Sequence, residues 1–165
     1  MKDNKIPRSH SAYDYQLLIK QILFCPMVYN PEEEIVYRDY SRYTYRDLRR
    51  RICQLANMLT KLGVKAGDTV AVMDYDSHRY LECFFAVPMI GAVLHTINTR
   101  LSPEQILYTI DHAEDDILLL HVDYLPVVEQ IRGRLDIVNK YVIMSDGEAI
   151  PSSIIIFEGE YENLL

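Results

Sequence analysis

The chain has 165 residues, of which 49% are hydrophobic and 25% are charged, as expected for an ordinary globular domain. A chain of this length buries enough surface to fold without a metal ion or a disulfide. Its net charge of −7 argues against nucleic acid or an anionic membrane as a partner, because both attract a basic surface. The cysteines, Cys25, Cys53 and Cys83, have no CxxC spacing, which predicts reduced thiols in the cytoplasm.

Several classes of site and segment are also disfavoured. Residues 1–12 are polar, so we expect a flexible start and no signal peptide. The apolar runs are too short to span a bilayer, which needs about 20 residues. The histidines do not pair at i,i+4, so no zinc or other metal site is expected. The glycines are not clustered, which excludes a Walker loop and a GxGxxG turn within this chain.

Residues 13–66 form the first structured region that the pattern predicts. A helix is expected over residues 13–24, ended by Pro26, with one apolar side made of Leu17, Leu18, Ile22 and Phe24. Residues 34–38 and 42–45 alternate in polarity around a short polar turn. This alternation predicts a small hairpin at the edge of a sheet.

The next helix gives the clearest local signal. Its apolar residues recur at steps of four and three and therefore share one face: Leu48, Ile52, Leu55, Leu59 and Leu62. Thr44 and Asp47 have the spacing of a capping box, and Gly63 suits a left-handed C-terminal cap. Arg46, Arg49, Arg50 and Arg51 form a basic cluster. A solvated helix face is the preferred interpretation, with a phosphate-facing patch as the alternative.

Residues 67–145 alternate short apolar runs with helical segments. Strands are expected at 69–73, 92–96, 117–121 and 141–144, and helices at 77–90, 103–113 and 124–132. The runs lack clean alternation, which is typical of strands covered on both faces. Strand–helix–strand units predict parallel pairing through right-handed crossovers. The predicted fold is therefore α/β, with a doubly wound, mostly parallel sheet, helices on both faces and the small N-terminal hairpin.

Five segments, in order, resemble one family. Residues 44–48 (TYRDL) are followed by residues 62–72 (LGVKAGDTVAV), which is similar to the entry segment of the acyl-adenylate-forming, or AMP-binding, enzymes. Residues 80–88 (YLECFFAVP) and 91–104 (GAVLHTINTRLSPE) resemble the medium- and long-chain fatty acyl-CoA synthetases of that superfamily. The tail, residues 146–165, ends in YENLL, which is similar to the short helix preceding the family's phosphate loop.

The resemblance implies that residues 1–165 are the N-terminal portion of the family's large domain. The family uses ATP and magnesium to convert a carboxylate into an acyl-adenylate, and then transfers the acyl group to CoA. Its phosphate loop and its C-terminal domain are not found in these residues. We therefore expect an N-terminal fragment that binds no cofactor and has no ligase activity alone. The resemblance also implies a homodimer, because family members tend to associate through this region.

Two other functions remain possible at this stage. The chain could be a non-catalytic α/β binding or interaction module. A flavodoxin-like domain is less favoured, because residues 74–77 (DYDS) are bulky and acidic where a flavodoxin needs a Ser/Thr/Gly-rich turn. A receiver-like domain would fit Asp74 and Asp76, but no lysine follows the later strands in the expected place.

No catalytic residue is predicted, but four residues are candidates for contact with substrate: His95, Thr96, Asn98 and Arg100. They follow a predicted strand, and open α/β sheets bind ligands at the carboxyl ends of their strands. The structural alternatives are a hydrogen bond from His95 to backbone, a local turn held by Asn98, and an ion pair between Arg100 and Glu104.

Overall fold

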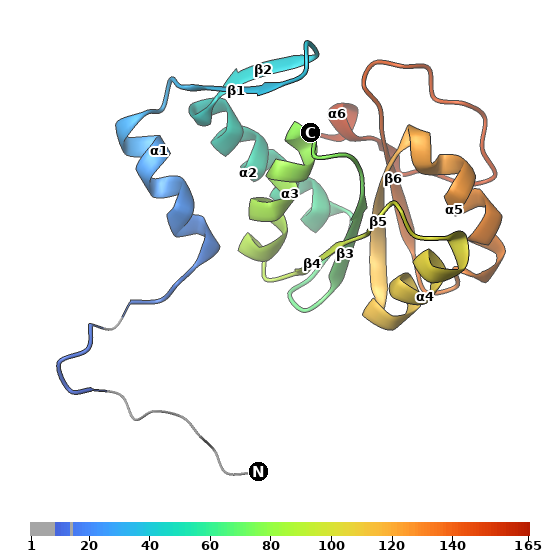
Figure 1. Ribbon diagram of the computed structural model, residues 1–165, viewed down its shortest axis with the longest axis horizontal. Helices are drawn as coiled ribbons and strands as arrows, with labels where there is room; N and C mark the ends of the chain where they lie inside the picture. Colours follow the sequence, from blue (N-terminus) through green and yellow to red (C-terminus); the bar gives the residue numbers. More distant parts are fainter. Residues whose placement is uncertain (1–8, 14) are drawn as a thin grey trace.

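The computed structural model describes residues 9–13 and 15–165, and most of the segment expected to be flexible lies outside them. It confirms the doubly wound α/β fold (Figure 1). The strands of the main sheet lie in the order β4-β3-β5-β6-β7, and every neighbouring pair is parallel. Their bounds are β3 Thr69–Met73, β4 Val93–Thr96, β5 Asp115–His121, β6 Lys140–Met144 and β7 Gly159–Glu160.

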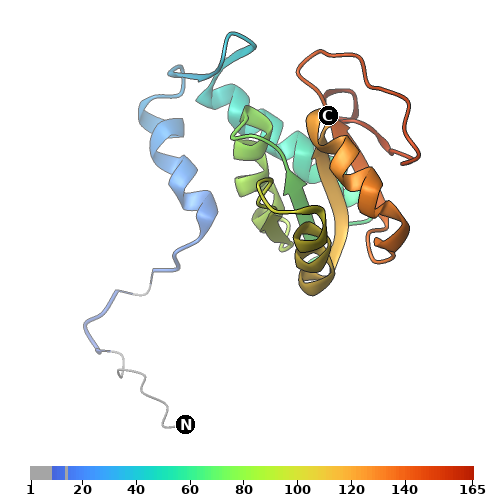
Figure 2. The same cartoon turned by 45° about the vertical axis from the view of Figure 1, so that its right-hand side comes forward.

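Helices cover both faces of this sheet, as predicted (Figures 1 and 2). On one face lie α2 (Tyr45–Lys61) and α3 (His78–Met89), and on the other lie α4 (Pro103–Ala113) and α5 (Leu125–Ile131). Because side chains alternate along a strand, β3 contributes Val70 and Val72 to the first core and Ala71 and Met73 to the second. Each face of the sheet is thus buried under its own pair of helices.

The predicted hairpin forms, but not at the edge of the main sheet. Strands β1 (Glu34–Tyr37) and β2 (Ser41–Thr44) pair antiparallel with each other and make a separate two-stranded sheet. Arg38 takes a positive φ of 51° in the turn between them. The hairpin lies above the carboxyl ends of the parallel strands (Figure 1).

Helix α2 begins and ends where its sequence predicts. The Thr44 side chain accepts a hydrogen bond from the Asp47 amide at 3.2 Å, and the Asp47 carboxylate accepts one from the Thr44 amide at 3.2 Å. The Thr44 hydroxyl, which donates to the Asp47 carboxylate at 2.9 Å, and the Thr44 amide together hold the pKa of Asp47 below its ordinary value. Gly63 follows the helix with a φ of 95°, a conformation that costs glycine little.

The first helix differs from its prediction. A 3-10 helix, η1 (Ile19–Leu23), leads directly into α1 (Phe24–Tyr29), and Pro26 lies inside α1 instead of ending the helix. Proline is tolerated in a first helical turn because the amide it lacks has no intrahelical partner there. Since residues 15–18 are not helical, the predicted apolar side does not form. Its members Leu17, Leu18, Ile22 and Phe24 are exposed, and Leu23 is buried instead.

Two strands also depart from the prediction. Strand β4 has only one neighbour, and its residues are exposed or half-buried, so this apolar run is not covered on both faces. Strand β7 was not predicted, because two residues are too short to produce a pattern. It leads into α6 (Tyr161–Leu164), the short helix expected near the end.

Short 3-10 turns, η2 (Val122–Tyr124) and η3 (Arg132–Arg134), flank α5. Within the described residues, no helix is long and apolar enough to cross a membrane.

Candidate functional site at the carboxyl edge of the sheet

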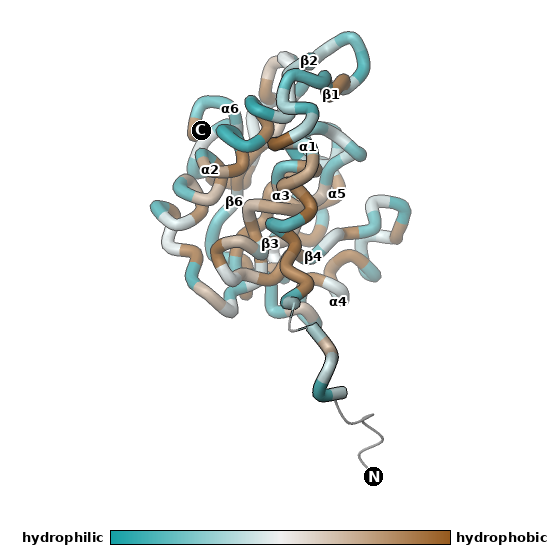
Figure 3. Tube along the Cα trace, turned by 90° about the vertical axis from the view of Figure 1, so that its left-hand side faces the viewer, coloured by the Kyte–Doolittle hydropathy of each residue, from teal (hydrophilic) through white to brown (hydrophobic). Residues whose placement is uncertain are grey.

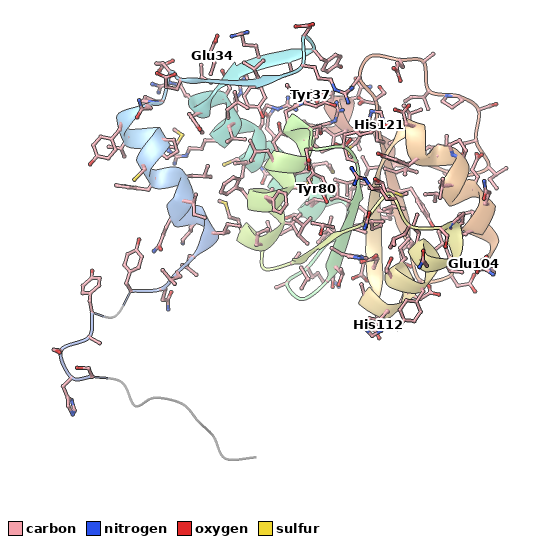
Figure 4. All side chains as sticks on the ribbon, in the orientation of Figure 1. Glu34, Tyr37, Tyr80, Glu104, His112 and His121 are labelled. Carbon is pink, nitrogen blue, oxygen red and sulfur yellow. The ribbon has the colours of Figure 1, made fainter. Side chains whose placement is uncertain are left out.

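The strand order places one reversal point in the sheet. The chain passes from β3 through α3 to β4 on one side, and then returns through α4 to β5 on the other side of β3. Because α3, which follows β3, and α5, which follows β5, cover opposite faces, the connections after these two neighbouring strands diverge, and ligands of open α/β sheets bind at such points. Figure 4 shows Tyr37 and His121 at this carboxyl edge and His112 at the opposite end.

Asp74, the first residue after β3, is held against the start of α3. Its carboxylate accepts hydrogen bonds from the Tyr75 amide at 2.7 Å and from the Ser77 hydroxyl. Ser77 in turn accepts a bond from the Tyr80 amide at 3.3 Å, which caps α3. Burial raises the pKa of Asp74, although the Ser77 hydroxyl and the Arg79 guanidinium favour its ionised form. This acid is therefore a structural partner of the helix end.

Arg79 connects α3 to the residues after β6. Its side chain is 0% exposed, donates to the Ser145 carbonyl at 3.1 Å and forms an ion pair with Asp146. Asp146 also accepts a hydrogen bond from the Tyr37 hydroxyl at 3.2 Å. Burial alone would raise the pKa of Asp146, but the Arg79 guanidinium outweighs it and keeps that pKa below its ordinary value. The pair is ionised and ties the hairpin to the sheet.

His121 ends β5 beside this pair. Its Nδ1 accepts a hydrogen bond from the Asp123 amide at 3.2 Å, so in the neutral ring the proton is on Nε2. That Nε2 lies 3.9 Å from the Asp146 carboxylate and has no hydrogen-bond partner among the described residues. The Tyr75 ring packs edge-on against the imidazole at 5.3 Å. His121 thus presents a buried N–H toward a carboxylate that Arg79 already neutralises.

The predicted substrate-facing residues do not gather in one cluster. The Nδ1 atom of His95, on β4, lies 2.7 Å from the carboxylate of Asp115. Asp115 is fully buried at the start of β5. The imidazole is therefore turned toward the amino end of the strands. Burial raises the pKa of Asp115, and the bond to His95 opposes that rise. Thr96 is exposed at the end of the strand. No hydrogen bond or ion pair joins His95 to Asn98 or Arg100 within the described chain.

The turn that follows β4 is held locally. The Asn98 side chain accepts a hydrogen bond from the Arg100 amide at 3.0 Å, which is the structural alternative that the sequence offered. Arg100 is exposed, and Glu104, its suggested partner, pairs instead with Arg134 at 2.6 Å. Contact with substrate at this turn stays a prediction.

A second buried cluster was missed by sequence reasoning. Glu82 on α3 is fully buried and accepts hydrogen bonds from Arg51 at 2.6 Å and from the Tyr161 hydroxyl at 2.6 Å. Arg51 also reaches Glu162 at 2.8 Å, and His78 lies 3.3 Å from the same carboxylate. Burial raises the pKa of Tyr161, whereas His78 and Arg51 outweigh burial and lower the pKa of Glu162. A single glutamate within the apolar sequence of α3 was the signal that could have pointed to this cluster.

The basic cluster of α2 is mostly paired with acids. Arg46 contacts Glu32, and Arg50 lies 2.9 Å from Asp47. Together with the pairing of the half-buried Arg51, these pairs favour the interpretation of a helix face over that of a phosphate patch. The described residues contain no group of three or more side chains suited to a metal ion.

Comparison with known protein families shows to which family this chain belongs. The profile of the family described as "AMP-binding enzyme" matches residues 27–163. This chain belongs to the AMP-binding enzyme family. The resemblance to its acyl-CoA ligases is therefore confirmed, and the carboxyl edge is part of an AMP-binding enzyme fold.

Relatives of this chain include a long-chain-fatty-acid–CoA ligase of Thermus thermophilus, 43% identical over 130 residues, covering 76% of this chain and 24% of the relative. A medium-chain-fatty-acid–CoA ligase of Ectopseudomonas oleovorans is 34% identical over 154 residues, covering 91% of this chain and 28% of the relative. The chain therefore spans about a quarter of the length of these curated relatives.

Solved structures agree with this assignment. An anthranilate CoA ligase in complex with anthranoyl-AMP superposes with a TM-score of 0.76 at 26% identity, over 87% of this chain and 27% of that one. A putative long-chain-fatty-acid CoA ligase from Rhodopseudomonas palustris gives a TM-score of 0.71 at 26% identity, over 87% of this chain and 35% of that one.

Proposed function

We propose that these residues form the N-terminal portion of the large domain of an ATP-dependent fatty acid–CoA ligase. The observation that carries the proposal is the 43% identity to the Thermus thermophilus long-chain-fatty-acid–CoA ligase. In this proposal residues 13–66 contribute the N-terminal helices and hairpin, residues 67–145 the parallel βαβ unit, and residues 146–165 the connection onward. The reaction would join a fatty acid to CoA through an acyl-adenylate, with long- or medium-chain acids as candidate substrates.

We expect these residues by themselves to bind neither ATP nor magnesium. Two acids at the carboxyl edge are already engaged: Asp74 by Ser77 and the Tyr75 amide, and Asp146 by Arg79 and Tyr37. Replacing these partners with a cation would leave Arg79 buried beside an added positive charge, which is costly. We therefore assign this segment a scaffolding role and derive no catalytic step from it.

The turn after β4 is proposed as part of the substrate wall in the complete enzyme. His95 would contribute indirectly, by fixing β4 through Asp115, while Thr96, Asn98 and Arg100 border the turn. None of these residues is assigned a role as acid or base. The role is one of shape and position at the end of the strand.

Association and location are proposed on separate grounds. Exposed apolar side chains along η1 and α1 that do not line the groove described below, such as Ile22 at 65% and Tyr29 at 73%, support self-association as a homodimer. Cys25 and Cys53 are free and exposed, which supports a reducing compartment such as the cytoplasm.

A chimeric enzyme tests the proposed function. The matching 130-residue segment of the Thermus thermophilus ligase is replaced by the corresponding segment of this chain, and acyl-CoA formation is measured with ATP, magnesium and fatty acids of several lengths. We expect an active enzyme, because the two proteins are 43% identical over the exchanged segment. A soluble, folded chimera with no fatty-acid-dependent activity would contradict the proposal.

The same chimera separates the two interpretations of the turn. His95→Ala and Asn98→Ala are made separately, and apparent affinities for fatty acid and CoA are compared with thermal stability. A role in the substrate wall predicts weaker apparent affinity in at least one variant. Loss of stability with unchanged affinities would show that the turn is only scaffold.

A further inference from the structure

A groove lies between the N-terminal helices and the main body of the fold, away from the carboxyl edge. It has a volume of about 510 Å³ and is bordered by η1, α1, α2 and the end of α3. Leu23 and Ile52 are its buried residues, and Phe24, Met27 and Met89 are its more exposed apolar walls. Figure 3, viewed from this side, shows the apolar residues along α1 in front of α2 and α3. Its size is within the range of sites for small organic ligands.

Among the described residues, only two charged side chains line this groove, and both are cations. They are Lys20 on η1 and Arg49 on α2. Within the described chain neither has an acidic partner, whereas the other three arginines of α2 are each paired with a carboxylate. Two unpaired cations beside an apolar surface are notable in a chain with a net charge of −7. The groove therefore combines a hydrocarbon-like wall with local positive charge.

We propose that this groove binds an amphipathic monocarboxylate, at a site separate from the proposed ligase chemistry. The hydrocarbon chain would lie against Phe24, Met27 and Met89, where apolar area leaves water and the flexible methionines adapt to the chain. The carboxylate would accept charge-assisted hydrogen bonds from Lys20 and Arg49. A free carboxylate is favoured over an anionic bilayer, because the negatively charged molecule is repelled from such a surface. The proposal does not rest on the ligase activity.

The cysteines provide a direct test with an internal control. Cys53 lines the groove, Cys25 is exposed on α1 without lining it, and Cys83 is buried. The whole chain is alkylated with iodoacetamide in the presence of increasing decanoate below its micelle concentration, and modification at each cysteine is followed by peptide mass spectrometry. We expect saturating decanoate to slow the alkylation of Cys53 at least fivefold, and to change that of Cys25 less than twofold.

Matched variants test the role of charge. The double variant Lys20→Gln, Arg49→Gln should lose the protection of Cys53, while Arg46→Gln, whose arginine pairs with Glu32 outside the groove, should retain it.

Equal protection by uncharged 1-decanol, or equal protection of Cys25, would overturn the proposal. Protection that rises with protein concentration without decanoate would assign the groove to a second copy of the chain. Protection by phosphatidylglycerol vesicles but not by decanoate would assign it to a membrane; both outcomes contradict the proposal.

Discussion

Asp146 is shared by two arginines whose surroundings differ completely. The Arg79 side chain is 0% exposed and that of Arg38 is 58% exposed, yet both reach the same carboxylate. An ion pair in water contributes little to stability, because solvent screens it and the side chains lose entropy. In a buried pair, removing one partner leaves the other charge without compensation. Removing Arg79 should therefore cost much more stability than removing Arg38, although both pair with the same carboxylate.

We predict that Arg79→Gln lowers the free energy of unfolding by about 3–5 kcal/mol, because it leaves Asp146 partly buried without its main partner. The matched variant Arg38→Gln should cost less than about 1 kcal/mol. Urea denaturation of the two variants and the wild-type chain makes the comparison. Similar losses in both variants would contradict the distinction between the buried and the exposed arginine.

The Glu162 carboxylate predicts a dependence of stability on pH. Its pKa lies below the ordinary value of 4.5, because His78 and Arg51 outweigh the effect of burial. The unfolded chain therefore binds this proton more readily, and the stabilisation is complete above the ordinary pKa and lost as pH falls through the folded pKa. We expect the stability difference between wild type and Glu162→Gln to shrink as pH is lowered from about 6 to about 3. A difference that is constant over this range would contradict the assignment.

At the scale of elements, α2 depends on one packed stripe. Leu55 is 0% exposed at the centre of that stripe, whereas Ile22 on η1 is 65% exposed. Leu55→Ala should destabilise the chain by about 2–5 kcal/mol, because it removes methyl groups from a packed core. Ile22→Ala should change stability by less than about 0.5 kcal/mol. A chemical denaturation series that finds equal effects would contradict the described burial.

Elements with a long apolar period were predictable, and those decided by tertiary contacts were not. The period of α2, its cap at Thr44 and the run of β3 each carry their own signal in the sequence. Pro26 was misread because proline ends a helix only beyond its first turn, and the sequence did not show where that turn begins. The partners of Glu82 are 31 and 79 residues away in the chain, so no local pattern could identify its cluster.

At the scale of the whole molecule, the apolar N-terminal helices predict association. Exposed side chains on η1 and α1 are not covered within the described chain, and exposed apolar patches of this kind favour contacts between molecules. Light scattering at micromolar concentration should give the mass of a dimer, and Ile22→Glu combined with Tyr29→Glu, at two exposed residues outside the groove, should shift the equilibrium toward monomer. A wild-type chain that is monomeric at these concentrations would contradict the proposed dimer.

In the function proposed above, this chain supplies scaffold, and not transfer chemistry, to a fatty acid–CoA ligase. Charge that develops in adenylate formation needs groups already positioned to stabilise it, whereas at the carboxyl edge Asp146 is engaged by Arg79 and Asp74 by the Ser77 hydroxyl. The most direct measurement is pyrophosphate release by the purified chain with ATP, magnesium and a medium- or long-chain fatty acid. We predict release equal to that of a control without protein; turnover clearly above that control would contradict the claim.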